Sequence, residues 1–328
     1  MPALGLCYAL LSGIANGLFS APMKMIRRWK WENIWLLFIV VACLLMPAAM
    51  VLPVADWRAV FAASPQPAVA AAFLFGFLWG FGAILFGLSV DRLGVSLANT
   101  LVIGLSSALG SLVPLILGGA LKLEPRLLVL FLGVATFIAG VWMCGAAGRL
   151  RDGGSPAGSG SGYLFAIGSG VMSAIFNVGY SLALPIAAAG QRLGYSSFTA
   201  TNCIWLAMLG AGSAPNIIYC ALLMRKHSSL GCYAEEPVKG WSLGVVMGLL
   251  WGGSIFLYGA ATPLLGDIGP SIGWPLSLAV GLLVANLMGV LLGEWRAAPP
   301  AARRRMRLGI LVLLAAIVLC AASTRVGV

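Results

Sequence analysis

Ten long apolar stretches constrain the fold of this chain more than any other feature of its sequence. A helix that crosses the hydrocarbon core of a bilayer needs about 20 predominantly apolar residues. Stretches of about this length, separated by charged residues, proline or glycine, lie at about residues 2–22, 34–53, 68–90, 95–119, 127–147, 163–188, 198–224, 240–262, 269–293 and 308–324. The pattern predicts an all-α integral membrane protein with ten transmembrane helices.

The composition excludes several classes of protein. Of 328 residues, 61% are apolar and 9% are charged, whereas soluble domains are about a quarter charged. Ten spans leave room only for short connections, which excludes a large soluble catalytic domain. The net charge of +11 does not indicate a nucleic-acid partner, because most basic residues flank apolar stretches, where they contact lipid headgroups. The seven cysteines lack C-x-x-C spacing, so we expect neither a disulfide framework nor a zinc or other metal site. No cofactor is expected.

A stretch rich in glycine and serine divides the chain into two halves of five spans. The sequence GGSPAGSGSG runs from Gly153 to Gly162 and is typical of a flexible linker. We therefore expect a first five-helix repeat over residues 1–148, a cytoplasmic linker over 149–162 and a second five-helix repeat over 163–328.

The basic residues predict the orientation of the spans, because Lys and Arg of short loops stay on the cytoplasmic side. Fifteen of the 20 lie after odd-numbered spans, namely Lys24, Arg27, Arg28, Lys30, Arg92, Arg149, Arg151, Arg225, Lys226, Lys239, Arg296, Arg303, Arg304, Arg305 and Arg307. Only four lie after even-numbered spans, namely Arg58, Lys122, Arg126 and Arg192. Both termini should thus be periplasmic, and the second half of five spans should be inverted relative to the first.

The third and eighth spans carry an internal repeat. GFLWGFGAILFGLSVDRLG from Gly76 and GLLWGGSIFLYGAATPLLG from Gly248 share seven identities at a constant offset of 172, including Trp79 with Trp251. A weaker match aligns SGIANGLFS from Ser12 with SGVMSAIFN from Ser169. Inverted repeats are typical of secondary transporters, in which two similar halves alternately close the two ends of one cavity. The alternative is that the glycines only allow close helix packing.

Neutral polar and aromatic side chains inside the apolar stretches are candidates for substrate binding, because polar groups avoid lipid and face the bundle interior. Amides, hydroxyls and indoles suit an uncharged sugar or polyol. The candidate substrate-binding residues are Asn16, Ser20, Trp79, Asn99, Asn177, Tyr180, Trp251, Ser254, Tyr258, Trp274 and Ser277. Further polar residues in the spans are Ser106, Ser107, Asn202, Trp205, Asn216 and Asn286. The alternative for each Asn or Ser is an interhelical hydrogen bond.

Acidic residues are scarce and lie near the ends of spans. Glu32, Asp91, Asp267 and Glu294 are the candidates for coupling transport to protons, of which Asp91 and Asp267 are preferred. A charge that reaches the membrane surface from a helix end is the alternative role. The only histidine, His227, is expected to be solvated in a cytoplasmic loop.

Three segments resemble the bacterial L-rhamnose/proton symporter family of the drug/metabolite transporter superfamily. They are FSAPMKMIRRWKWENIW from Phe19, the pieces FGFLWGFG and FGLSVDRLG from Phe75 and Phe86, and GEWRAA from Gly293. The resemblance covers most of the chain and implies ten spans, outward termini and import of a deoxyhexose with a proton across the bacterial inner membrane. Members of that family carry Asn, Tyr, Gln and His where this chain has Ala83, Phe86, Ser254 and Ser277.

These observations favour a secondary active transporter over an enzyme, which would need a cluster of carboxylates or histidines near one interface. The expected partners are a small neutral polar substrate such as L-rhamnose, a proton and membrane lipids, while a homodimer stays open. A drug or metabolite exporter, or an uncoupled carrier of another small metabolite, is the alternative, which the aromatic and charge-poor interior also fits.

Overall fold

The computed structural model describes residues 2–93, 95–119, 124–151, 153, 160–291, 293 and 295–324. Within them, ten helical segments are long and apolar enough to cross a membrane, as the sequence predicts. The helices are α1 (Pro2–Leu18), η1 (Pro22–Met25), α2 (Trp31–Ile39), η2 (Val40–Leu45), α3 (Met46–Val51), α4 (Trp57–Ala62), α5 (Gln66–Leu93), α6 (Val95–Leu117), α7 (Pro125–Arg151), α8 (Gly160–Arg192), α9 (Ser197–His227), η3 (Leu230–Ala234), α10 (Pro237–Ala261), η4 (Thr262–Leu265), α11 (Gly269–Leu291) and α12 (Pro300–Ala322).

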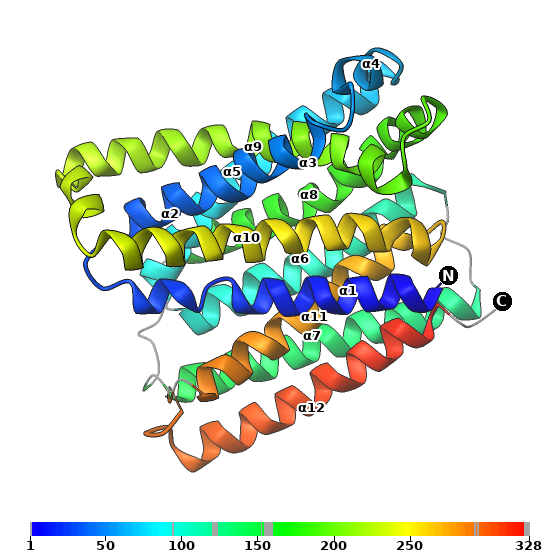
Figure 1. The fold of residues 1–328 in the computed structure, drawn as a ribbon. Coiled ribbons are helices and arrows are strands. Elements are labelled where there is room, and N and C mark those ends of the chain that lie inside the picture. Colours follow the sequence, from blue (N-terminus) through cyan, green and yellow to red (C-terminus); the bar gives the residue numbers. More distant parts are fainter. Residues whose placement is uncertain are drawn as a thin grey trace.

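The long helices form one bundle, and α1 begins at the same end at which α12 finishes (Figure 1). We call this end the terminal end and the other the loop end. The short helix α4 lies at the terminal end, whereas η3 lies at the loop end between α9 and α10 (Figure 1). As a result, α5 runs from the terminal end to the loop end and α10 runs in the opposite direction.

The second span is one continuous helical segment with a change of pitch. The π-helical turn η2 joins α2 to α3, and Pro47 lies at the start of α3. Proline has no amide hydrogen with which to donate to the preceding turn, and a π-turn accommodates such a local loss. The apolar stretch predicted over 34–53 therefore remains a single span, Trp31–Val51.

Several predicted boundaries differ from the structure by a few residues, and the largest difference is at the start of the last span. The last span was expected to begin at 308, but α12 begins at Pro300, because proline is favoured in the first turn of a helix and the following arginines are exposed on it. Such long cationic side chains extend to the headgroups. Likewise α7 continues to Arg151 and α8 begins at Gly160, so helix extends into both ends of the expected linker.

The two halves of the chain use corresponding pairs of helices to pack. In the described part, α5 packs on α8 and α10 packs on α1; α6 packs on α8 and α11 on α1; α6 packs on α7 and α11 on α12. The pair α5 and α9 has its counterpart in α10 and η2, and the last helices of the halves, α7 and α12, pack on each other. Each of these contacts is matched by one in which the halves exchange roles, whereas the contact between α8 and α9 has no counterpart of similar size between α1 and the second span among the described residues.

Hydrogen bonds repeat in the same way. The Ser12 hydroxyl on α1 donates to the carbonyl oxygen of Ser254 on α10 at 2.8 Å, and the Ser169 hydroxyl on α8 donates to the carbonyl oxygen of Gly82 on α5 at 2.8 Å. Ser12 aligns with Ser169 in the sequence repeat, and the offset of 172 aligns Gly82 with Ser254. The donors and the acceptors therefore both correspond.

The repeated glycines allow helices to approach closely. A side chain at Gly76 would overlap the backbone of Met208 on α9, and one at the equivalent Gly248 would overlap Val41 of η2. The packing role that the sequence left open for these glycines is thus real, and it occurs at equivalent helix contacts in the two halves.

Candidate substrate-binding site

A chain of aromatic rings crosses the interior of the bundle from the loop end. The ring centroids of Trp35 and Phe38 on α2 lie 4.8 Å apart, and Phe38 meets Trp251 of α10 edge-on at 5.7 Å. Trp251 stacks on Trp79 of α5, with centroids 5.2 Å apart and planes inclined by 14°. Trp79 then contacts Phe176 of α8 at 4.9 Å. The two tryptophans of the sequence repeat therefore touch each other at the junction of the halves.

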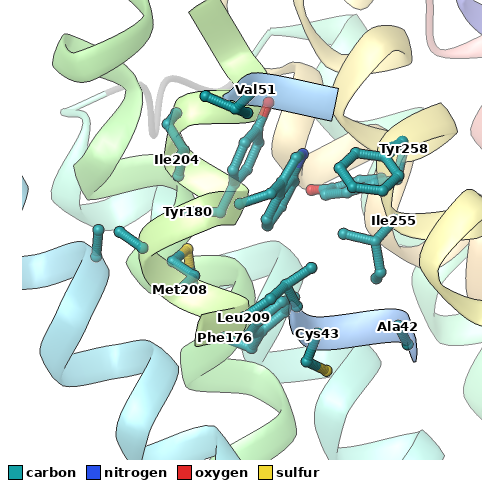
Figure 2. Packing of buried hydrophobic residues seen from close by; sticks show 14 of the residues in the cluster. Ala42, Cys43, Val51, Phe176, Tyr180, Ile204, Met208, Leu209, Ile255 and Tyr258 are labelled. Atoms are coloured by element: carbon teal, nitrogen blue, oxygen red, sulfur yellow. The ribbon is translucent and has the colours of Figure 1, made fainter. Parts of the chain in front are cut away.

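The aromatic chain continues toward the terminal end as a tight cluster. Trp205 of α9 stacks on Phe176 at 5.7 Å and on Tyr180 at 4.5 Å, the latter with planes inclined by only 8°. Tyr258 of α10 lies 5.5 Å from Tyr180 and 5.6 Å from Trp274 of α11. Figure 2 shows Phe176 and Tyr180 from α8 and Tyr258 from α10 gathered around α9. These side chains hold four helices together.

Asn177 is the polar centre of this cluster. Its side-chain nitrogen donates to the carbonyl oxygens of Gly110 on α6, at 2.8 Å, and Pro270 at the start of α11, at 3.2 Å. Its side-chain oxygen accepts a hydrogen bond from the Tyr258 hydroxyl. Because the side chain is fully buried, one amide connects α8 to three other helices.

Two further polar contacts strengthen the same region. The hydroxyls of Tyr180 and Thr262 hydrogen-bond to each other, and the indole nitrogen of Trp274 donates to the carbonyl oxygen of Ser106 on α6 at 3.2 Å. We call the set Asn177, Tyr180, Tyr258, Thr262 and Trp274 the terminal-end seal.

Burial changes along the aromatic chain. Trp35, Trp79 and Trp251 are half-buried, whereas Tyr180 and Trp205 are fully buried and Tyr258 is 2% exposed. Tyr258 and Thr262 lie where α10 approaches the terminal end. The rings nearest the terminal end are therefore fully enclosed, whereas Trp35, Trp79 and Trp251 keep part of their surface exposed.

The other predicted substrate-binding residues fall outside the seal. Ser254 and Ser277 are buried and are both linked to Ser12, whose hydroxyl lies 2.8 Å from the Ser277 hydroxyl and donates to the Ser254 carbonyl oxygen. Asn16 is half-buried where α1 approaches α11. Ser20 is exposed in the turn after α1, and Asn99 lies two turns before the contact of α6 with Trp274.

The four acidic candidates occupy different surroundings. Asp267 is exposed. The side chain of Asp91 and the whole of Glu294 lie outside the described residues. Glu32, in contrast, is 3% exposed at the start of α2.

Glu32 belongs to a hydrogen-bonded clamp at the loop end, made of Lys30, Glu32, Asn33, His227, Ser229 and Tyr233. Its carboxylate accepts a hydrogen bond from the Ser229 hydroxyl at 2.8 Å and lies 3.0 Å from Nδ1 of His227. Lys30 donates to the His227 carbonyl oxygen at 3.0 Å. Partial burial raises the pKa of Tyr233, so its hydroxyl stays protonated and donates to the Asn33 carbonyl oxygen at 3.0 Å.

The prediction that His227 is simply solvated was incomplete. Its ring is 39% exposed, yet it pairs with Glu32, because η3 folds the connection between α9 and α10 against the start of α2. The clamp therefore joins the second span to the end of the seventh and to the connection between α9 and α10.

Sequence reasoning did not select Trp35, Phe176 or Thr262 as site residues and named Trp205 only among the further polar residues of the spans. The structure places all four in or beside the aromatic chain. A signal existed for Phe176, which aligns with Phe19 in the weaker repeat. Nothing in the sequence distinguishes Thr262 from other threonines near helix ends.

An all-helical membrane bundle with a neutral polar and aromatic interior, joined by contacts that repeat between its halves, has the build of a membrane transport protein. The comparisons with known proteins specify the family. The chain belongs to the L-rhamnose-proton symport protein (RhaT) family, whose model matches residues 2–327. It is thus a member of a transporter family and not an enzyme.

Individual relatives are distant but match over nearly their whole length. The chain is 28% identical to the L-rhamnose-proton symporter of Cronobacter sakazakii and 26% identical to that of Klebsiella pneumoniae strain 342, with 95% of each chain covered in both cases. A solved crystal structure also aligns with 98% of this chain and 94% of its own, with a TM-score of 0.54 at 19% identity. That likeness shows the fold alone.

Proposed function

We propose that this protein is a bacterial inner-membrane carrier that imports a neutral sugar, L-rhamnose or a related deoxyhexose, together with a proton. The observation that carries the proposal is the Trp79 and Trp251 stack at the junction of the two halves. Flat aromatic faces suit the C–H faces of a sugar ring, and the neutral amides and hydroxyls nearby suit its hydroxyl groups. The family membership supports the same substrate class.

Transport would proceed by alternating access between two inverted five-helix repeats. The matched helix pairs and the matched hydrogen bonds of Ser12 and Ser169 support this arrangement. With both termini periplasmic, as the basic residues predict, the terminal-end seal would close the periplasmic side, and the half-buried tryptophans would be reached from the cytoplasm. Opening the seal while closing the loop end would carry the substrate across.

Glu32 is the acidic candidate that best fits a proton-coupling role. It is buried, it lies beside the partly exposed His227, and it joins the second span to the connection between α9 and α10. A change in its protonation would alter the clamp at one end of the bundle. Replacing Glu32 with Gln should abolish sugar accumulation against a gradient while sugar exchange across the membrane continues; loss of both activities, or of neither, would remove Glu32 from this role.

Proteoliposomes offer the decisive test. Purified protein should accumulate radiolabelled L-rhamnose, or a related neutral sugar, only when an inward proton gradient is imposed. Uptake that ignores the gradient would indicate an uncoupled carrier, and an outward flux of amphipathic compounds with no sugar uptake would indicate an exporter. The absence of uptake for every sugar would refute the proposed substrate class.

A further inference from the structure

Three buried polar side chains on α9 have groups without hydrogen-bond partners among the described residues. These are the Thr201 hydroxyl, the indole nitrogen of Trp205, and both the nitrogen and the oxygen of the Asn202 amide. Thr201 and Asn202 are each 1% exposed and Trp205 is fully buried. Most buried polar groups in proteins are hydrogen-bonded, so each such exception calls for an explanation.

Thr201 and Trp205 face the same point on α10. They are four residues apart and so lie on one side of α9. A Cβ placed at Gly259 of α10 would overlap the Trp205 indole nitrogen and lie 3.1 Å from the Thr201 methyl group. The edge of the indole and the threonine methyl group therefore meet a residue of α10 that has no side chain.

This meeting point lies next to the terminal-end seal. Tyr258 precedes Gly259, and the carbonyl oxygen of Gly259 is already occupied by the Thr262 hydroxyl at 3.1 Å. Tyr180 stacks on the Trp205 ring and covers one face of the indole. Movement of α10 away from α9 would uncover the indole nitrogen and the Thr201 side chain, and the same movement would open the seal, because Tyr258 of the seal lies on α10.

We propose that Thr201, Asn202 and Trp205 form a recognition site for sugar hydroxyl groups, which opening of the terminal-end seal uncovers. The proposal rests on the proposed sugar transport and adds the residues that would first bind the substrate at this end. Thr201 lies one turn and Trp205 two turns into α9, between the membrane surface and the Trp79 and Trp251 stack. An indole N–H donor with a neighbouring hydroxyl and amide matches adjacent hydroxyls on a ring, each of which both donates and accepts.

Isosteric replacement separates this role from a structural one. Thr201→Val removes a hydroxyl that the sugar-free protein leaves unpaired, so the sugar-free protein should melt about 1–2 °C higher. The same change should raise the KM for sugar uptake roughly 3- to 10-fold. Trp205→Phe, which keeps an aromatic ring but removes the N–H, should raise KM similarly. Ser213→Ala is the matched control, because Ser213 is 3% exposed on the same helix and its hydroxyl already donates to the Gly210 carbonyl oxygen.

Sugar analogues then identify the hydroxyl groups involved. The panel contains rhamnose analogues that each lack one ring hydroxyl. At least one analogue should bind the wild-type protein and Thr201→Val with equal affinity, because removing the sugar hydroxyl and removing the Thr201 hydroxyl eliminate the same hydrogen bond. A lower melting temperature of Thr201→Val would show that its hydroxyl is paired and would overturn the proposal. So would normal KM values in both variants while wild type transports sugar. If no sugar raises the melting temperature of the wild-type protein and the wild-type protein transports none, the proposed function itself fails. This inference then fails with it.

Discussion

Replacing Asn177 with Ala should shift the bundle toward a state that is open at the terminal end. The change removes the hydrogen bonds from its amide to the carbonyl oxygens of Gly110 and Pro270 and the one it accepts from Tyr258. Interhelical hydrogen bonds in bilayers average about 0.6 kcal/mol each, so three contribute about 2 kcal/mol to the closed state. If the open state lacks all three, its population rises roughly 30-fold.

Chemical labelling of a single cysteine measures that shift. Ser271 is 1% exposed one residue after Pro270, so Ser271→Cys in a background without the seven native cysteines reports opening at this end. A membrane-impermeant maleimide added from the terminal side should react up to about 30-fold faster when Asn177→Ala is also present. Ser181→Ala is the control, because its hydroxyl only donates to the Asn177 carbonyl oxygen within α8. Unchanged labelling with Asn177→Ala would refute the idea that this amide holds the seal closed.

Three other substitutions follow from the packing. Trp79→Ala removes one face of the central aromatic stack and should abolish sugar uptake without loss of expression; normal uptake would disprove the site. Gly259→Ala should prevent closure of the terminal end and reduce uptake at least tenfold, whereas Gly253→Ala, where a Cβ meets open space, should have no effect in the same uptake assay. Gly80→Ala pushes α5 from α9 and should cost about 1–3 kcal/mol, seen as a lower melting temperature than that of Gly87→Ala, which also meets open space.

The number of spans was predictable because it depends on the number and length of the apolar stretches, which can be read from a single sequence. Ten apolar stretches gave ten spans, and a constant offset between the third and eighth spans identified Trp79 and Trp251, which the structure stacks. Asn177, Tyr180, Tyr258 and Trp274 were selected as polar or aromatic residues within lipid-length helices, and the structure assembles them. The cost of a polar group in lipid makes such residues stand out without any knowledge of tertiary contacts.

Helix ends and loop contacts were less predictable, since they depend on partners far away in the chain. The pairing of Glu32 with His227 requires η3 to fold back over α2, and no local pattern encodes that. Similarly, the Ser277 hydroxyl meets Ser12, and the Ser254 hydroxyl donates to the carbonyl oxygen of Trp251 in its own helix. Neither could be foreseen, because the side of a helix that faces a given neighbour is set by packing. The spacing of apolar residues cannot identify that side, because most faces of a membrane helix are apolar.

Ser20 and Asn99 are predicted site residues that lie outside the terminal-end seal, and the internal repeat accounts for their position. Ser20 follows Phe19 as Asn177 follows Phe176, so the repeat aligns Ser20 with Asn177. A Cβ on Gly13 would meet Ser277 and Val280, and one on the equivalent Gly170 would meet Val102 and Leu105.

That second correspondence extends along α6 and α11. Asn99 precedes Val102 by the same three residues by which Trp274 precedes Ser277, so Asn99 aligns with Trp274. The two residues that lie apart from the seal are therefore the counterparts of two that form it. We expect Ser20 and Asn99 to approach each other when the loop end closes, and cysteines at both positions should then cross-link faster in the presence of transported sugar. Cross-linking at a rate independent of sugar, and unaffected by Asn177→Ala, would contradict the exchange of roles between the halves.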